Sequence, residues 1–377
     1  MSLFPFIRPD VPPISAWVPI LAEAYEAGRF SNFGPLSRRL EAALAATWGG
    51  AASACVATSS GTAALAAPLI AAGVRGRVVL PAFTFPATLT AIRMAGAEPF
   101  LVDVDPDTWR MPLDLLHRAL TRTDARAAVV LHPFGMRSDF SAHAKLAGER
   151  DALLVIDNAA GLGAKRACLE ADAHCYEACS LHVTKPFAVG EGGVIFAHRS
   201  REDDLRRALN FGLPPQGPAE LRGWGLNGKL SEMHAAVGLA VAEGFPARLV
   251  RRRSLVARYI ATVAKCSAVV CCTDPEAAPW QFFPLLLPGA EAAERFGAAA
   301  AARGMETRRY YVPALSSLSD VERLGPCPVA EDLATRICCL PVYADATPAE
   351  ITELTAVLDA SLAAALGTRP TPVVVRR

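Results

Sequence analysis

Apolar positions recur in two alternating patterns along the first 200 residues of the chain. Short runs rich in β-branched residues are typical of strands buried on both faces, and the segments between them carry apolar residues at the period of a helix. The pattern predicts strands at 53–57, 77–80, 99–103, 127–132, 153–157, around Cys179 and at 194–197, and helices at 62–72, 86–95, 113–120 and 138–150.

Buried strands that alternate with helices predict an α/β fold, in which a mainly parallel seven-stranded sheet is covered by helices on both faces. Later in the chain, the pattern predicts a helix at 231–264, a strand at 282–287, and helices at 291–303 and 348–366. We therefore predict a large α/β domain at 1–245 and a small α+β domain at 246–377, with residues 1–30 placed against the small domain.

Composition narrows the class of protein. Of the 377 residues, 52% are hydrophobic and 20% are charged, which is typical of a globular protein rather than a disordered chain. The net charge of +1 argues against nucleic acid and anionic membranes as partners. Five arginines at 248–258 fall on one predicted helix, which we interpret as solvated or facing a second subunit. No apolar run is long enough to span a membrane, and residues 1–8 do not resemble a signal peptide, so a cytoplasmic protein is expected.

The ten cysteines do not form a recognisable disulfide or metal pattern. Cys271–Cys272 and Cys338–Cys339 are adjacent pairs, a poor geometry for structural disulfides. Cys168, Cys175 and Cys179 lie near two histidines, but the CxxC spacing of zinc sites is absent. We expect reduced thiols and no metal.

The first candidate for chemistry is Lys185, because lysine is rare in this chain. There are 5 lysines against 33 arginines, so a lysine that persists can mark a position where a guanidinium would not serve. A lysine can lose its proton in a buried site and condense with a carbonyl group, whereas arginine stays charged. Lys185 also precedes a glycine-rich turn at 190–193.

Three further signals lie at predicted strand ends. Ser60-Gly61-Thr62 joins a strand to a helix and could bind an anion, although the same residues are common helix caps. Asp157 ends a strand and could hold a heterocyclic nitrogen protonated, or cap a following helix. Phe85 could lie beside a planar ring. With a reactive lysine, these are the parts that pyridoxal phosphate requires.

With these motifs, the sequence resembles the DegT/DnrJ/EryC1/StrS family of sugar aminotransferases, which use pyridoxal phosphate and have fold type I. The resemblance covers nearly the whole chain. The matching motifs are Ser31–Pro35, Ser60-Gly61-Thr62, Phe83-Thr84-Phe85, His132–Gly135, Asp157-x-Ala159, Ser180-x-His182-x-Thr184-Lys185, Gly190–Gly193, Gly225–Glu232 and Leu340–Tyr343.

The resemblance implies a role for each matched site residue. Lys185 would bond to the cofactor and transfer protons, and Asp157 would contact the pyridine nitrogen. Phe85 would stack on the ring. The cofactor phosphate would be held by Ser60, Gly61, Thr62 and Ser180 and, from the partner subunit, by Asn227. Lys229 and His182 are implied as substrate contacts. An obligate homodimer with shared sites follows from this arrangement.

Some positions depart from the family pattern. Ala160 stands where Gln or His often contacts the phenolic oxygen of the cofactor, so another group or a water would supply that contact. Ser316 replaces a common histidine of the small domain, and Lys229 replaces a frequent arginine, which keeps the charge but loses the bidentate fork.

The function implied is transfer of an amino group from an amino acid, with glutamate expected, to the keto group of a nucleotide-linked deoxysugar. Two alternatives stay open at this point. One is amination of another ketone, such as a ketocyclitol of secondary metabolism. The other is a protein that binds pyridoxal phosphate without catalysis, against which the intact Lys185 and Asp157 argue.

Overall fold

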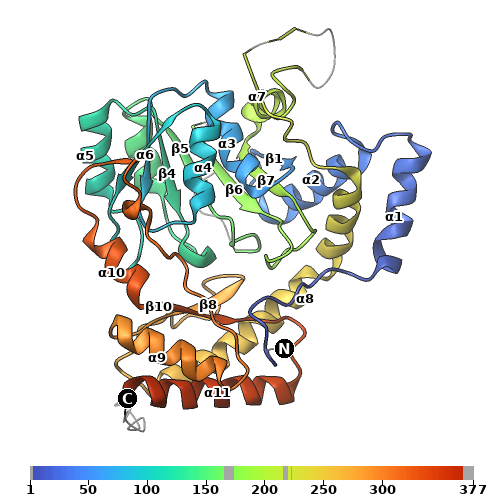
Figure 1. The fold of residues 1–377 in the computed structure, drawn as a ribbon. Helices are drawn as coiled ribbons and strands as arrows, with labels where there is room; N and C mark the ends of the chain where they lie inside the picture. The colour runs from blue at the N-terminus through green and yellow to red at the C-terminus, as the bar shows by residue number, and fades with distance from the viewer. Residues whose placement is uncertain (1–2, 165–173, 215–219, 222, 368–377) are drawn as a thin grey trace.

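The computed structural model describes residues 3–164, 174–214, 220–221 and 223–367. These residues form an eight-stranded sheet with the strand order β1-β7-β6-β5-β4-β2-β3-β9, in which β7 runs antiparallel to both of its neighbours and the other pairs are parallel (Figure 1). The strands are β1 (Ser53–Thr58), β2 (Arg77–Pro81), β3 (Glu98–Val102), β4 (Ala127–Leu131), β5 (Leu153–Asp157), β6 (Cys175–Ser180), β7 (Gly193–His198) and β9 (Glu322–Arg323).

The mainly parallel sheet is as predicted, but the count of seven strands is wrong by one. The additional strand, β9, is only two residues long and both are exposed. It pairs with the sheet edge at β3, and Glu322 accepts a 2.8 Å hydrogen bond from Arg77 at the start of β2. Two polar residues give no hydrophobic signal, so this strand could not be found from apolar patterning.

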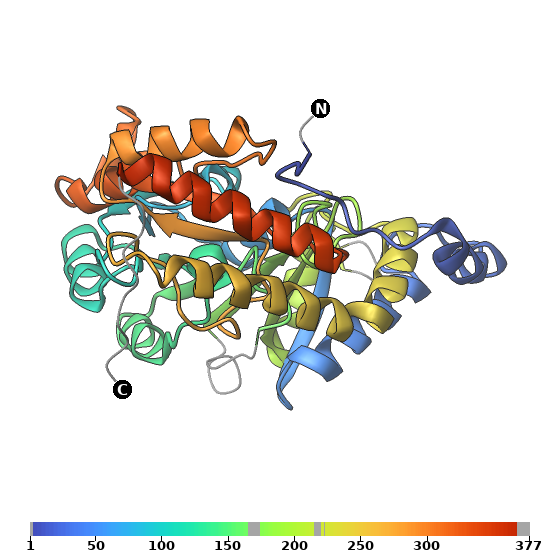
Figure 2. The same cartoon turned by 90° about the horizontal axis from the view of Figure 1, so that it is seen from below.

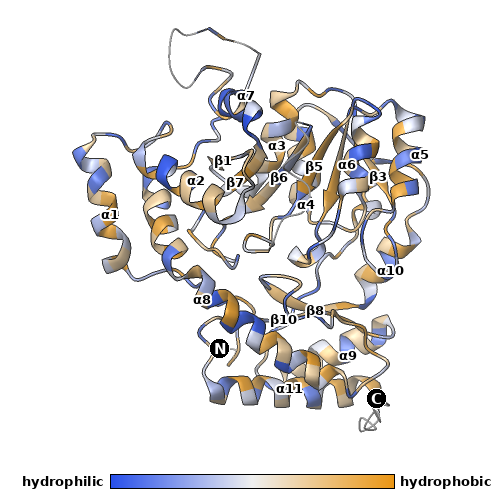
Figure 3. Cartoon of the chain, turned by 180° about the vertical axis from the view of Figure 1, so that it is seen from behind, coloured by the Kyte–Doolittle hydropathy of each residue, from blue (hydrophilic) through white to orange (hydrophobic). Residues whose placement is uncertain are grey.

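Helices cover both faces of the sheet because its strands are apolar on both sides. In β4, Val129 packs into one hydrophobic core and Val130 into the other. Hydrophobic residues accordingly dominate the centre of the sheet in Figure 3. One face is covered by α3 (Gly61–Ala71), α4 (Pro86–Met94) and α7 (Glu202–Ala208), and the other by α2 (Pro35–Trp48), α5 (Leu113–Thr123), α6 (Ser141–Gly148) and the first half of α8 (Glu232–Val263).

The C-terminal region forms a second, smaller layer below the sheet. The strands β8 (Phe282–Leu286) and β10 (Ile337–Pro341) pair antiparallel. Behind them, α9 (Ala290–Ala301), α11 (Pro348–Leu366) and the last part of α8 lie side by side (Figure 2). The remaining elements are α1 (Ile14–Glu26), α10 (Pro328–Arg336) and the short 3-10 helices Pro133–Gly135, Arg199–Arg201 and Leu315–Ser317.

The large and small layers are joined by α8. Its first half carries Phe245 into the core of the large sheet, and its second half carries Tyr259 into the core of the C-terminal layer. The division that we predict at residues 245 and 246 therefore falls inside a continuous helix, and division into two domains stays a prediction. The start of the chain contacts the C-terminal region: Phe4 pairs with Met305, and Phe6 packs on Phe282.

The arginine-rich part of α8 is not simply a solvated surface. Arg252 is 4% exposed and donates hydrogen bonds to the carbonyl oxygens of Trp280 and Val342. Arg248 and Arg253 form ion pairs with Asp10 and Glu276. These arginines connect the helix to the N-terminal segment and to the chain that leads into β8.

Candidate active site

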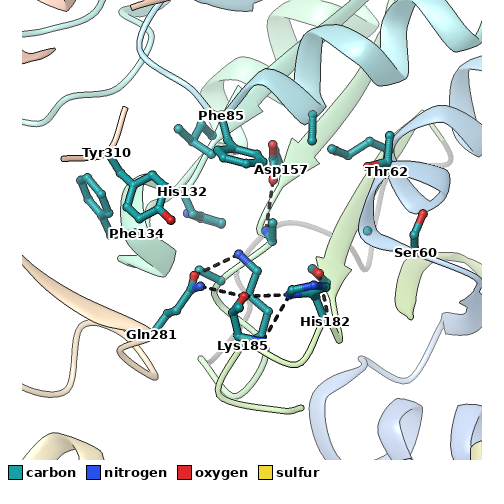
Figure 4. Close-up of a pocket in the computed structure, with 18 of the residues that line it drawn as sticks. Ser60, Thr62, Phe85, His132, Phe134, Asp157, His182, Lys185, Gln281 and Tyr310 are labelled. Carbon is teal, nitrogen blue, oxygen red and sulfur yellow. Dashed lines mark hydrogen bonds between the residues drawn. The ribbon is translucent and has the colours of Figure 1, made fainter. Parts of the chain in front are cut away.

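The carboxyl ends of β1, β4, β5 and β6 meet at a cavity of about 340 Å³. This is the edge at which open α/β sheets bind ligands. The first turns of α3 and α4 contribute to the same wall, and the opposite wall comes from the C-terminal region through Gln281, Phe282, Tyr310 and Tyr311 (Figure 4). The cavity therefore lies where the two layers of the protein meet.

The turn between β1 and α3 forms one end of the cavity. Ser60 is the N-cap of α3, and its hydroxyl oxygen accepts a 3.1 Å hydrogen bond from the N–H of Ala63. Gly61 and Thr62 follow in the first turn and also line the cavity. First-turn N–H groups have no partner within the helix, and the helix dipole adds positive charge there. The capping role of Ser60 is therefore compatible with the predicted anion site at this turn.

Two close approaches explain the glycines around this turn. A Cβ on Gly61 would lie 2.8 Å from Cβ of Ser180, at the end of β6. A Cβ on Gly193 would lie 2.6 Å from the carbonyl oxygen of Ser60. Real Cβ atoms do not approach other atoms this closely, so both positions need glycine. The result is a narrow cradle with Ser60, Gly61, Thr62 and Ser180 around it.

Asp157 lies at the end of β5 with its carboxylate buried and facing the cavity. Oδ2 accepts a 2.7 Å hydrogen bond from the hydroxyl of Thr88, and Oδ1 accepts a 3.1 Å bond from the N–H of Ala159. No helix begins in residues 158–164, so the alternative of a helix cap is wrong. Burial raises the pKa of Asp157, whereas these hydrogen bonds and the charge of Lys185 oppose the rise. A cationic heteroatom in the cavity would stabilise this carboxylate.

Lys185 lies in the loop after β6, and its amine points into the same cavity (Figure 4). The Nζ atom donates a 2.9 Å hydrogen bond to Oε1 of Gln281. Burial lowers the pKa of Lys185 to about 8, while the negative charge of Asp157 opposes the shift. A measurable fraction of the amine is therefore neutral near pH 7, which suits it to act as a nucleophile or a base.

Two other predicted residues, Phe85 and His182, also line the cavity. Phe85 precedes α4, is 50% exposed, and contacts Tyr310 edge to face at 6.2 Å between ring centroids. The Nδ1 atom of His182 lies 2.9 Å from the hydroxyl oxygen of Thr184, and its Nε2 lies 3.4 Å from Glu191. The imidazole thus contacts protein groups on both ring nitrogens.

Asn227 and Lys229 are not among the described residues that line the cavity of their own chain. The amine of Lys229 donates a 2.8 Å hydrogen bond to Oδ1 of Asn227 and lies 4.5 Å from the centre of the Phe211 ring. Asn227 does not cap α8, because Ser231 is the N-cap of that helix. The segment does return to the cradle of its own chain, since the N–H of Ser59 donates a 2.7 Å hydrogen bond to the carbonyl oxygen of Gly228.

Comparison with known proteins gives the same assignment as the motifs. The model of the DegT/DnrJ/EryC1/StrS aminotransferase family matches residues 17–359. The chain belongs to this family. The predicted family, fold type and enzyme class are thereby confirmed, and pyridoxal phosphate as the cofactor agrees with them.

Several known proteins are similar to this chain along most of its length. The protein Rv3402c of Mycobacterium tuberculosis is 31% identical, over 93% of this chain and 88% of its own. The dTDP-4-amino-4,6-dideoxy-D-glucose transaminase of Shigella dysenteriae is 26% identical, over 90% of this chain and 93% of its own. Among solved structures, DesI in the presence of its TDP-sugar product has a TM-score of 0.85 and 28% identity, over 98% of this chain and 95% of its own.

Several residues that line the cavity, or that support a residue lining it, were not predicted from the sequence. Thr88 lies within a segment that was recognised, but no local signal showed that its hydroxyl reaches Asp157. Gln281 is 96 positions from Lys185, and only the fold brings the two together. Its rarity could have been a signal, since the chain has only two glutamines. The tyrosines at 310 and 311 were not predicted as site residues.

The other sequence-level predictions concern thiols, metals and membranes. Among the described residues, Cys266, Cys271, Cys272, Cys327, Cys338 and Cys339 form no disulfide, and Cys168 lies outside those residues. In the described part of the chain, no group of three or more His, Cys, Asp and Glu side chains is arranged to hold a metal ion. None of the helices in that part is both long and apolar enough to cross a membrane.

Proposed function

We propose that this aminotransferase uses pyridoxal phosphate to move an amino group from glutamate to a keto group of a nucleotide-linked deoxysugar. The observation that carries the proposal is the meeting of Lys185, Asp157 and the Ser60–Thr62 cradle in one cavity. Each of these groups, taken alone, could have a purely structural role. Together they provide an amine, a buried carboxylate and an anion site for one ligand.

The residues of the cavity fit pyridoxal phosphate. Ser60, Gly61, Thr62 and Ser180 would hold its phosphate at the narrow cradle. Asp157 would contact the ring nitrogen, because its buried carboxylate is stabilised by a positive neighbour. When bound, the cofactor supplies an electron sink for bond changes at the amino-bearing carbon.

Lys185 is the proton-transfer group of the proposed reaction. In the neutral form its amine can take a proton from the amino-bearing carbon of the donor and return a proton during amination of the acceptor. The lowered pKa of about 8 makes both steps accessible near neutral pH. Tyr310 and Phe282 stack at 5.0 Å between ring centroids and form an apolar part of the cavity wall.

The proposed acceptor rests on the named relatives. The Shigella protein is named for a dTDP-linked 4-amino-4,6-dideoxy sugar, and DesI is described with its TDP-sugar product. Both are similar to this chain over at least nine-tenths of its length. A nucleotide-linked keto sugar is therefore the first acceptor class to test.

A homodimer with shared sites is part of the proposal. No arginine lies among the described residues around the cavity, yet an amino acid donor and a nucleotide sugar both carry negative charge. Asn227 and Lys229 lie outside the cavity of their own chain, and Lys229 lies beside the exposed ring of Phe211. If a second copy packs on this surface, Asn227 and Lys229 of each subunit would lie at the cavity of the other subunit.

Product analysis tests the proposed function. Purified protein would be incubated with pyridoxal phosphate, L-glutamate and single acceptors, and the products identified by mass spectrometry. The panel would contain the dTDP-4-keto-6-deoxy sugar that corresponds to the Shigella product, related keto sugar nucleotides, and an inosose as a ketocyclitol. We expect amination of a nucleotide sugar. Amination of the inosose alone would replace the proposed acceptor, and failure of glutamate to form 2-oxoglutarate with every acceptor would contradict transamination from glutamate.

A further inference from the structure

A chain of hydrogen bonds links the amine of Lys185 to His182, and the ring of His182 in turn lies close to the exposed carboxylate of Glu191. Lys185 Nζ lies 2.9 Å from Oε1 of Gln281, and Nε2 of Gln281 lies 3.2 Å from the hydroxyl oxygen of Thr184. That hydroxyl lies 2.9 Å from Nδ1 of His182, whose Nε2 lies 3.4 Å from Oε1 of Glu191. Gln281 is 8% exposed, whereas the side chain of Glu191 is 61% exposed.

One consistent assignment of donors satisfies the whole chain. The backbone N–H of Thr184 donates to Nδ1 of His182, so this nitrogen is an acceptor. The Thr184 hydroxyl can then give its single proton to the same nitrogen and accept from the amide nitrogen of Gln281. The carbonyl oxygen of Gln281 is thereby directed at Lys185, and the remaining ring proton of His182 is on Nε2, the nitrogen that lies 3.4 Å from Glu191.

We propose that Gln281 is a positioning residue for Lys185. Its amide, anchored by Thr184, holds the amine of Lys185 in the cavity whenever that amine is not bonded to the cofactor. Transamination requires a free Lys185 amine that stays close to the reacting carbon. A carbonyl oxygen suits this purpose because it accepts a hydrogen bond from both the ammonium and the neutral amine, so it orients the group in either protonation state.

This inference rests on the proposed role of Lys185, but Gln281 itself comes from the other layer of the protein. It immediately precedes β8, whereas Lys185 and Thr184 follow β6. The hydrogen bonds of Gln281 therefore couple the position of the amine to the packing of the C-terminal layer on the sheet. The other titratable groups around the amine are Asp157 from β5, His132 after β4, and Tyr310 and Tyr311 from the C-terminal region.

The test compares two substitutions of equal length. Gln281→Met removes both hydrogen bonds of the amide, and Gln281→Glu keeps an acceptor oxygen while adding negative charge. The protonation of Lys185 would be measured in the apoenzyme by competitive acetylation across pH, followed by peptide mass spectrometry. We expect the labelling midpoint of Lys185 to fall by about half a pH unit in Gln281→Met and to rise by about one unit in Gln281→Glu.

The kinetic signature would be measured in the half-reaction with glutamate. We expect Gln281→Met to reduce the maximal rate about tenfold with little change in KM, because the amide positions the amine rather than the substrate. Thr184→Val should reduce the rate less, and the double variant should be no slower than Gln281→Met, since Thr184 acts through Gln281. Circular dichroism and Tm would establish that each variant is folded.

The inference is overturned if the labelling midpoints of both Gln281 variants match the wild type, or if Gln281→Met changes only KM. Additive effects of Gln281→Met and Thr184→Val would also contradict it, because independent contributions mean that Thr184 does not act through the amide. Failure of the proposed function has a different signature, namely a wild-type protein that converts no glutamate. Even in that case, the labelling midpoint of Lys185 in the apoenzyme still measures the effect of Gln281 on the amine.

Discussion

The hydroxyl of Thr88 donates a 2.7 Å hydrogen bond to the buried carboxylate of Asp157. Thr88 lies in the first turn of α4, and Phe85 is the N-cap residue of the same helix. The start of one helix therefore supplies an aromatic ring to the cavity and a hydroxyl group to the carboxylate of Asp157. Pro86 fixes the backbone at the first position of α4, where a missing N–H costs nothing.

The first prediction separates activity from stability at Asp157. Asp157→Asn should slow the glutamate half-reaction by about 100-fold or more, because the cofactor ring loses its charged partner. The same change should not destabilise the apoenzyme at pH 7. The pKa of Asp157 is raised by folding, so its contribution to stability is present below the unfolded value and declines as pH rises through the folded value. Single-turnover absorbance and thermal unfolding would measure the two effects.

Thr88→Val is the matched control for this prediction. It removes one hydrogen bond to the carboxylate but keeps the charge, and valine has nearly the shape of threonine. We expect a rate loss of about tenfold, clearly smaller than for Asp157→Asn. Near-normal turnover in Asp157→Asn would show that Asp157 has only a structural role.

The second prediction concerns the cradle. Gly61→Ala should weaken binding of pyridoxal phosphate at least tenfold, because the added methyl group would overlap Ser180. Equilibrium dialysis of the apoenzyme would give the affinity. Adding Ser180→Gly to Gly61→Ala removes the Cβ that the methyl group meets, so the double variant should recover thermal stability without the phosphate contact of the hydroxyl. Unchanged affinity in Gly61→Ala would mean that the phosphate binds elsewhere.

The third prediction is complementation between subunits. Lys185→Ala protein and Asn227→Ala/Lys229→Ala protein should each be inactive as homodimers. After subunit exchange, activity should return to about a quarter of wild type, since half of the dimers are mixed and each mixed dimer has one intact site. If mass spectrometry of intact complexes shows mixed dimers and no activity returns, the sites are not shared.

Much of the fold was predictable because buried parallel strands carry a strong apolar signal. The predicted ranges of β5 and α11 match the observed ranges at both ends. The strand β10, Ile337–Pro341, was missed because its two adjacent cysteines were considered only as thiols. The helix α1 was missed as well, since its N-cap is Pro13, with no capping side chain, and Pro19 interrupts its pattern.

Some residues of the candidate site could likewise be predicted from the sequence, and others could not. Residues that end strands, such as Asp157 and Ser180, could be predicted because topology alone brings strand ends together. Gln281 could not, because its contact with Lys185 depends on how the C-terminal layer packs on the sheet. The position of residues 225–229 beside the cradle of their own chain could not be predicted for a related reason. Only the folded backbone shows that Gly228 pairs with Ser59.

The last prediction is that Lys185 alone bonds to pyridoxal phosphate. The proposed function depends on this bond more directly than on any other. Purified protein would be loaded with the cofactor, reduced with borohydride, digested and mapped by mass spectrometry. We predict one modified peptide, with the phosphopyridoxyl group on Lys185. The same group on Lys145, Lys165, Lys229 or Lys265, or on no lysine, would contradict the assignment.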